Sequence, residues 1–210
     1  MIKPPPVSWS IARWTVFLAL ATSLGSSLEA RAPTQTAVLA GGCFWGMEGV
    51  FEHVRGVQKV VSGYAGGSVQ DANYEAVSSE RTGHAEAIMI TFDPSKVSYS
   101  QLLSIFFTVA HDPTEVDRQG PDVGRSYRSA IFPLNAQQRS QALRSIAEFA
   151  RSREGHAKIA TRIESGHFYP AEPVHQGFLA RHPDNPYIVV NDLPKLVRLK
   201  SSYPGLWTSY

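Results

Sequence analysis

The sequence of 210 residues contains a single cysteine, Cys43, so it cannot form an internal disulfide. Its Lys and Arg residues are scattered and the formal net charge is only +2, which excludes the dense basic surface of a nucleic-acid-binding protein. No two histidines have a recognised zinc-binding spacing such as HExxH, and we expect no metal site. We assign His84, His111 and His175 to structural hydrogen bonding.

The N-terminal residues have the order of a secretory signal peptide. Lys3 and Arg13 precede the apolar run 14–24, which is shorter than the ~20 residues of an ordinary membrane span, and small residues follow up to Ala32. We predict that residues 1–32 are a signal peptide and that the protein is exported to the periplasm, an oxidising compartment. The alternative is an uncleaved leader that anchors the protein in a membrane.

The remaining residues, 33–210, are expected to form one globular domain, since the chain is 43% hydrophobic and 18% charged. Short apolar runs predict strands, and apolar residues at helical spacing predict helices. The predicted strands are residues 37–42, 57–64, 84–92, 126–132 and 158–164, and the predicted helices are residues 45–54, 98–110, 135–155 and 172–180. The segment beyond residue 180 is punctuated by prolines and is expected to be extended.

The order of the first six elements is strand, helix, strand, strand, helix, strand, which is the split βαβ arrangement. We therefore expect an α+β protein with a two-layer, ferredoxin-like core, an added helix and strand, and an extended C-terminal segment that wraps over the surface. In this fold Cys43 lies where the first strand ends and the first helix begins.

Several local features of these elements can also be predicted. Ser98 and Asn135 are expected to cap the helices that follow them. The strand at 84–92 should place Glu86 on the same face as Ile88, Ile90 and Phe92. The buried stripe of the helix at 135–155 is expected to comprise Leu143, Ile146, Ala147 and Ala150, and Gly155 should end that helix.

The residues around Cys43 describe a reactive thiol. Gly41 and Gly42 permit a sharp turn and the close approach of a ligand, and the amide groups of a helix start lower the pKa of a thiol. Phe44 and Trp45 can form an aromatic wall for an apolar ligand group. A lone cysteine is more often a small buried hydrophobic residue, but the glycine pair and the helix start favour a functional role.

A series of short motifs follows in order along the chain. They are GCFWG (42–46), GYAGG (63–67), TGHAE (82–86), HDP (111–113), RQGPDVG (118–124) with YRS (127–129), and FYPAE (168–172) with HQ (175–176). Together they resemble the signature of the A-type peptide methionine sulfoxide reductases over about residues 37–200. The resemblance implies an oxidoreductase without a bound cofactor that reduces the S epimer of methionine sulfoxide, free or in proteins, and so repairs oxidised proteins.

The resemblance assigns the nucleophile to Cys43, the acid to Glu86 and the hydroxyl donors to the sulfoxide oxygen to Tyr64 and Tyr127. The chemistry needs these groups, because a sulfoxide sulfur is a poor electrophile until its oxygen is protonated or strongly hydrogen-bonded. Glu86 can donate a proton only if its pKa is raised, as apolar surroundings would do. After the attack Cys43 becomes a sulfenic acid.

The resemblance further implies that Phe44 and Trp45 hold the S-methyl group and that Asp122 joins the polar network through water. Without the resemblance these positions have ordinary structural explanations. Glu86 is equally compatible with the wet face of a strand, Tyr64 and Tyr127 with core rings, and Asp122 with a loop-shaping side chain.

Two other classes of function stay open at this point. A cysteine hydrolase would pair Cys43 with a downstream histidine such as His175. A non-catalytic exported binding module would use the aromatic wall only to hold apolar groups. Consumption of a methionine sulfoxide substrate, compared with a Cys43→Ser variant, separates these two from a reductase.

The sequence departs from the family pattern in its sulfur content. Many relatives carry further cysteines in the C-terminal tail, whereas this tail has none, and Val77 and Ser79 stand where relatives often have a cysteine and a glycine. The sulfenic acid therefore needs an external thiol, and we expect a thioredoxin-like protein, a glutaredoxin or glutathione, with dithiothreitol serving in vitro. We also expect the protein to be a monomer.

Overall fold

The computed structural model describes residues 1–4, 33–152 and 158–209. The chain divides into a unit of Met1–Arg31 and a unit of Ala32–Tyr210, and only the second has described secondary structure. Most of the predicted signal peptide, like the predicted helix end at Gly155, lies outside the described residues. Within the described ranges, no helix combines the length and the apolar character that a membrane crossing requires.

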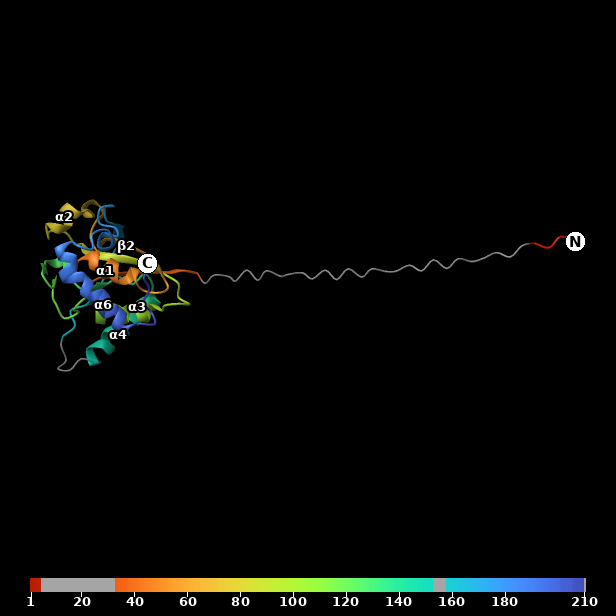
Figure 1. Cartoon of the computed structure of the whole chain (residues 1–210). Coiled ribbons are helices and arrows are strands. Elements are labelled where there is room, and N and C mark those ends of the chain that lie inside the picture. The colour runs from red at the N-terminus through yellow and green to blue at the C-terminus, as the bar shows by residue number, and fades with distance from the viewer. Residues whose placement is uncertain (5–32, 153–157, 210) are drawn as a thin grey trace. The chain divides into compact units, whose positions relative to one another are not determined.

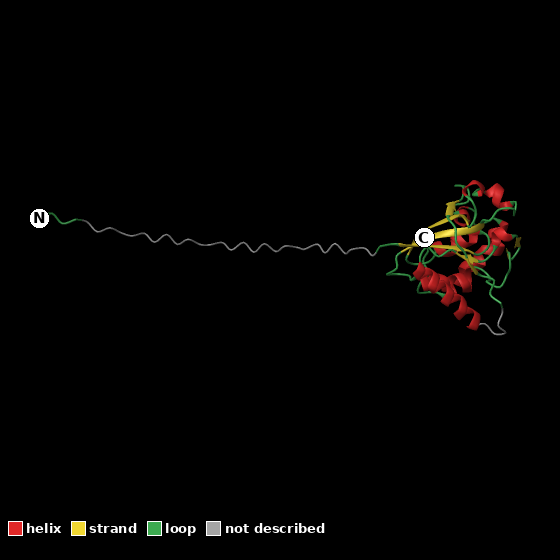
Figure 2. Cartoon of the chain, turned by 180° about the vertical axis from the view of Figure 1, so that it is seen from behind, coloured by secondary structure: helices red, strands yellow, loops and turns green. Residues whose placement is uncertain are grey.

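The domain is built on a mixed sheet, drawn in yellow in Figure 2. Its described strands run in the order β7-β6-β1-β3-β2-β8. They are β1 (Gln35–Ala40), β2 (Val57–Ala65), β3 (Ala85–Phe92), β6 (Ala130–Ile131), β7 (Arg162–Ile163) and β8 (Phe168–Pro170). All neighbours are antiparallel except β6 and β7. The inner order β6-β1-β3-β2 is that of the split βαβ, so the predicted α+β core is confirmed. A separate ribbon joins β4 (Arg118–Gln119) and β5 (Asp122–Val123).

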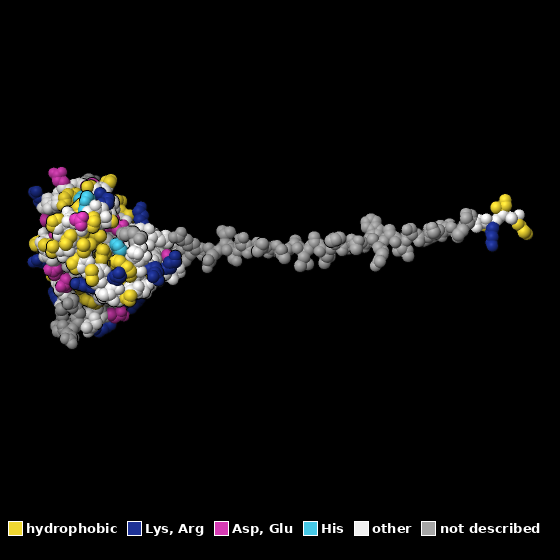
Figure 3. Space-filling view, in the orientation of Figure 1, with side chains coloured by type: hydrophobic (Ala, Val, Ile, Leu, Met, Phe, Trp, Pro, Cys, Tyr) yellow, Lys and Arg dark blue, Asp and Glu magenta, His cyan; other side chains and the backbone are white. Residues whose placement is uncertain are grey.

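The helices gather beside the sheet (Figure 1). They are α1 (Phe44–Glu52), α2 (Tyr74–Ser78), α3 (Tyr99–Ile105), α4 (Ala136–Ser152), α5 (Phe178–Arg181) and α6 (Leu193–Ser202). A π-helical turn, Phe106–Ala110, continues α3, another, Ile188–Asp192, precedes α6, and 3₁₀ turns form at Val69–Asp71 and Arg125–Tyr127. Helix α1 packs on β2 and β3 and also contacts α5 and α6. On the face that Figure 3 shows, acidic and basic side chains are interspersed with apolar ones.

The residues of β3 alternate between two faces as predicted, and the two faces pack in different clusters. Ile88, Ile90 and Phe92 are fully buried in the larger core with α1 and α3, whereas Ala85 and Ala87 belong to a smaller cluster on the opposite face. Glu86 shares the face of Ile88 and is only 4% exposed. The sheet therefore delivers a carboxyl group to the apolar side of the domain, beneath α1.

The predicted helix caps are present. The Gln101 backbone N–H donates to Ser98 Oγ while the Gln101 side chain accepts from the Ser98 backbone, which forms a capping box. At α4, the Gln138 backbone N–H donates to Asn135 Oδ1 over 2.8 Å. These local signals depend on neighbouring residues only, which is why the sequence predicts them well.

The buried stripe of α4 differs from the prediction. Ala142 is buried and Ile146 and Phe149 pack against the core, whereas Leu143 is 50% exposed. The Gln138 side chain is buried and donates to the carbonyl oxygen of Thr36 on β1 over 2.7 Å. This contact sets the rotation of α4, and apolar spacing alone does not reveal it.

The predicted strands at 126–132 and 158–164 are reduced to β6 and β7. Residues 125–127 form a 3₁₀ turn instead, because the Glu80 side chain accepts hydrogen bonds from both the Ser126 backbone N–H and the Ser126 hydroxyl. The Glu80 side chain thus takes the place of the neighbouring strand as hydrogen-bond partner of residue 126. The predicted helix at 172–180 is likewise shorter and begins only at Phe178, in α5.

The expectation of an extended C-terminal segment is wrong. Residues 188–202 are helical, first as a π-helical turn and then as α6. Pro194 falls in the first turn of α6, a position where proline is tolerated. Leu199 is fully buried and Leu196 packs against the core, so tertiary burial stabilises a helix that proline punctuation argued against.

Candidate active site

Cys43 is the residue that precedes the first turn of α1, as predicted. Gly42 connects it to β1 with a φ of +91°, in the left-handed region that favours glycine. A Cβ at Gly42 would lie 2.6 Å from Gln119 Cγ, and a Cβ at Gly41 would lie 2.9 Å from the His111 ring. The glycine pair therefore permits the turn and the close approach of the Gln119 and His111 side chains. Cys43 itself is 8% exposed.

The pKa of Cys43 differs from the sequence-based expectation. Burial raises it well above its ordinary value, Glu86 and Asp192 raise it further, and only the backbone amide of Trp45 lowers it. The helix start does contribute as predicted, but burial and the neighbouring carboxylates outweigh it. The resting site thus favours the thiol, and the thiolate becomes easier to form when those carboxyl groups are neutral.

Glu86 lies directly beneath the cysteine turn. One carboxylate oxygen, Oε2, accepts a hydrogen bond from the Phe44 backbone N–H over 3.0 Å. Burial raises the pKa of Glu86 to about 8, against the lowering effect of that hydrogen bond. The predicted condition for an acid, a carboxyl group that keeps its proton at neutral pH, is therefore met.

The two predicted tyrosines lie on different elements near Glu86. Tyr64 sits opposite Glu86 in the β2–β3 ladder and is fully buried, with its pKa raised by burial first. Its hydroxyl donates to Glu172 Oε2 over 2.9 Å, so here it has a protein acceptor. Tyr127 is the last residue of the 3₁₀ turn Arg125–Tyr127. Its pKa is raised by burial and then by Glu86 and Asp122.

The aromatic wall is built from both predicted rings and additional partners. Phe44 is 1% exposed and its ring centroid lies 5.8 Å from that of Tyr64. Trp45 stacks on Phe178 of α5 at a centroid distance of 3.8 Å and an interplanar angle of 10°. The Trp45 indole N–H donates to His175 Nδ1 over 3.3 Å. The loop before α5 therefore orients the indole.

The histidines are engaged in structural contacts. His175 accepts from Trp45 and its Nε2 lies 4.0 Å from Glu172 Oε2, so its ring is oriented by those groups and not by the thiol. The His84 ring bonds the Gly67 N–H and the Ser68 carbonyl oxygen. The His111 ring bonds the Phe106 carbonyl oxygen and Ser129 Oγ. In the part of the chain that the structure describes, no cluster of potential ligands could hold a metal ion.

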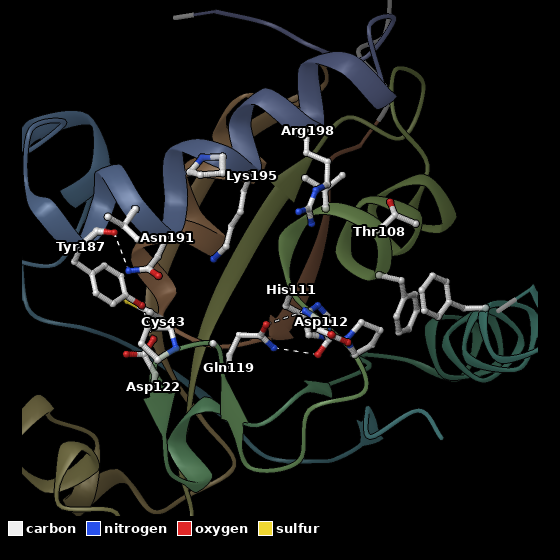
Figure 4. A pocket seen from close by; sticks show the side chains of 18 residues that line it. Cys43, Thr108, His111, Asp112, Gln119, Asp122, Tyr187, Asn191, Lys195 and Arg198 are labelled. Carbon is white, nitrogen blue, oxygen red and sulfur yellow. Dashed lines mark hydrogen bonds between the residues drawn. The ribbon is translucent and has the colours of Figure 1, made fainter. Parts of the chain in front are cut away.

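Asp122 reaches the site from β5. It accepts a hydrogen bond from the Tyr187 hydroxyl, and burial raises its pKa. Both residues line a cavity of about 650 Å³ together with Cys43 (Figure 4). The structure thus brings all the predicted site residues around the start of α1.

Sequence reasoning missed several groups at the site. Glu172 lies inside the FYPAE motif but received no role, although its two carboxylate oxygens accept from the Tyr64 hydroxyl and the Tyr74 backbone N–H. Tyr187 and Asp192 lie in the segment predicted to be extended, where no local pattern marks them. Asp192 is fully buried, and a Cβ on Gly46 of α1 would lie 1.9 Å from its Oδ1.

Comparison with known proteins agrees with this geometry. The family model described as Peptide methionine sulfoxide reductase matches residues 35–204. A protein of Mesorhizobium japonicum named Peptide methionine sulfoxide reductase MsrA 2 is 53% identical over 182 residues, which cover 86% of this chain and 93% of that protein. A protein of the same name from Synechocystis is 51% identical over 81% of this chain and 80% of its own length.

Solved structures show the same likeness. The reduced form of Mxr1 from Saccharomyces cerevisiae has a TM-score of 0.68 at 29% identity and covers 72% of this chain and 87% of its own. Methionine sulfoxide reductase A of Corynebacterium diphtheriae has a TM-score of 0.67 at 32% identity, over 72% of this chain and 76% of its own. None of these comparisons supports a cysteine hydrolase or a binding module. The chain belongs to the peptide methionine sulfoxide reductase family and is an oxidoreductase that reduces methionine sulfoxide with a thiol.

Proposed function

We propose that Cys43 attacks the sulfur of an S-configured methionine sulfoxide while Glu86 protonates its oxygen. The observation that carries this assignment is the position of the Glu86 carboxyl group, which accepts the N–H of the residue next to the nucleophile and has a pKa of about 8. A neutral carboxyl group there supplies a proton and leaves one negative charge fewer beside the sulfur. Both effects favour attack by a thiolate.

The aromatic and hydroxyl groups around Cys43 can bind the S-methyl group and the oxygen of the sulfoxide. Phe44 and Trp45 offer apolar surface to the S-methyl group, and the Tyr127 hydroxyl can donate to the oxygen without adding charge. Tyr64 can do so only by leaving Glu172, its acceptor in this structure. Asp122, held by Tyr187, contributes to the polar network.

The chemical step transfers one oxygen atom. The thiol and the sulfoxide become a sulfenic acid on Cys43 and a thioether, so the cysteine sulfur loses the two electrons that the methionine sulfur gains. With no second cysteine in the chain, an external thiol must reduce the sulfenic acid. A thioredoxin-like protein, a glutaredoxin or glutathione would serve, and no bound cofactor is required.

One experiment tests both nucleophile and stoichiometry. Reduced protein is mixed with excess methionine sulfoxide without reductant, the released methionine is measured, and the protein is trapped with dimedone. We expect about one methionine per chain and an adduct on Cys43, because only one nucleophile can be oxidised. A Cys43→Ser control should release none. Sustained turnover without thiol, or an unmodified Cys43 after release, would refute the assignment.

We further propose that the enzyme is exported to the periplasm as a monomer after removal of residues 1–32. The order of basic residues, apolar run and small residues supports this proposal. Mass spectrometry of the mature protein should find a new N-terminus between residues 29 and 36. Intact Met1 in a membrane fraction would instead indicate an uncleaved anchor.

A further inference from the structure

The cavity beside Cys43 has a wall that the sulfoxide chemistry does not use. Cys43 and Asp122 line it, but the proposed acid, both catalytic tyrosines and the aromatic wall do not. The far side of the cavity is formed by α6 and the residues before it (Figure 4). The cavity therefore reaches the sulfur from the side of Asp122 and Tyr187, away from the proposed acid, the two catalytic tyrosines and the aromatic wall.

This separate wall is cationic. Lys195 and Arg198 project from α6 toward the cavity (Figure 4). Lys195 Nζ lies 3.0 Å from Asp192 Oδ1, a contact that fixes the ammonium group near the cysteine end. The guanidinium group of Arg198 has no hydrogen bond or ion pair within the described residues, and Arg198 is exposed. An unpaired guanidinium at a cavity mouth is well suited to a carboxylate.

The opposite wall carries the complementary charge. Asp112, in a loop, and Asp122, on β5, lie across the cavity from α6 (Figure 4). The lining therefore offers cations on one side and carboxylates on the other. A ligand with carboxylates at one end and an ammonium group elsewhere matches this distribution better than a simple dianion, which the aspartates would repel.

We propose that this cavity binds the reductant, and that the reductant is a small zwitterionic peptide thiol of the glutathione type, with a carboxylate on Arg198. The inference rests on the proposed function, since it concerns reduction of the sulfenic acid on Cys43. The volume of about 650 Å³ lies within the range of about 300–1,000 Å³ that is usual for small-ligand sites. Cys43 is 8% exposed, which favours a thiol that enters the cavity over one carried on a protein surface.

The redox step balances with two molecules of this thiol. The first thiolate attacks the sulfenic sulfur, forms a mixed disulfide with Cys43 and releases water. The second attacks the peptide sulfur of that disulfide, which returns the Cys43 thiol and leaves the oxidised peptide disulfide. The two electrons come from the two peptide thiols.

The test compares charge-reversed variants in each half of the reaction. Arg198→Glu reverses the unpaired cation, and Lys200→Glu makes the same change in the same helix outside the cavity. Methionine release without reductant measures the first half reaction, and steady-state turnover against glutathione or 2-mercaptoethanol measures the second. We expect Arg198→Glu to lower kcat/KM for glutathione about three- to tenfold, with normal methionine release and less effect at high salt.

The uncharged thiol and the control variant make the outcome decisive. Turnover with 2-mercaptoethanol should be unchanged in both variants, and Lys200→Glu should behave as the parent enzyme with glutathione. Unchanged glutathione kinetics in Arg198→Glu would overturn the inference. So would a defect confined to a peptide substrate or to a thioredoxin, because the cavity would then serve a macromolecule. Failure of methionine release in the parent enzyme would instead overturn the proposed function.

Discussion

Replacing Glu86 by glutamine should lower the activity of the enzyme without lowering its stability. The carboxamide has nearly the same shape, and its oxygen can still accept the Phe44 N–H that Glu86 Oε2 accepts over 3.0 Å. It cannot release a proton to a sulfoxide oxygen. The substitution therefore removes the acid while it leaves the buried packing beneath α1 in place.

The pKa of Glu86 sets the size of the expected changes in turnover and in stability. With a pKa of about 8, the carboxyl group is protonated about ten to one at pH 7, so nearly all of the enzyme holds the acid form. Loss of general acid catalysis costs about 10² to 10⁴ in rate, and we expect that loss in turnover. In the parent enzyme, turnover should fall as the pH rises through about 8, because the acid form disappears.

Glu86→Gln should lower turnover but raise stability. An unfolded glutamate loses its proton near pH 4.5, whereas folded Glu86 keeps it until about pH 8. Between these values the parent protein loses stability with rising pH, by up to about 1.4 kcal/mol per pH unit. Glu86→Gln has no such loss, which amounts to about 4 kcal/mol at pH 8, so at that pH its Tm should lie on the order of ten degrees above that of the parent, with little difference at pH 4.5.

The assay measures initial rates of methionine sulfoxide reduction and thermal unfolding at several pH values. Glu75→Gln is the matched control, since Glu75 is exposed on α2 and should change neither property. Near-normal turnover in Glu86→Gln would mean that the proton comes from a tyrosine or water. An unchanged Tm at pH 8 would mean that folded Glu86 is ionised, which would refute the reasoning from burial.

Three further predictions concern stability. Gly46→Ala should lower the free energy of unfolding, measured in urea titrations, by about 1–3 kcal/mol, because the new Cβ would lie 1.9 Å from Asp192 Oδ1. Gly205→Ala is the control and should cause no such loss, since nothing lies within 4 Å of a Cβ at Gly205. Glu48→Ala should cost about 2 kcal/mol in the same titrations, since a buried hydroxyl and a backbone N–H lose their acceptor; an equal loss in Glu48→Gln would contradict this account. Burial lowers the pKa of His111 to about 4, so stability should fall as the pH drops from about 6.5 to about 4, and His111→Gln should flatten that part of the profile; identical profiles would argue against it.

The sequence by itself determined the parts of this protein that depend on neighbouring residues. Alternation along β3 placed Glu86 on the same face as Ile88, Ile90 and Phe92, and capping residues marked the starts of α3 and α4. The glycines before Cys43 indicated a turn into a helix, and the ordered motifs indicated the family. Periodicity, caps and turns act over a few residues, so a single sequence contains their causes.

Only the tertiary structure decided which distant groups complete the site. Tyr187 contacts Asp122 and Asp192 packs against Gly46 because burial stabilises a helical C-terminal segment that its prolines argued against. The pKa of Cys43 followed burial and nearby carboxylates, although the helix start alone predicted the opposite direction. Desolvation and the charges of distant residues depend on the packed arrangement of the whole domain, so local sequence patterns do not contain them.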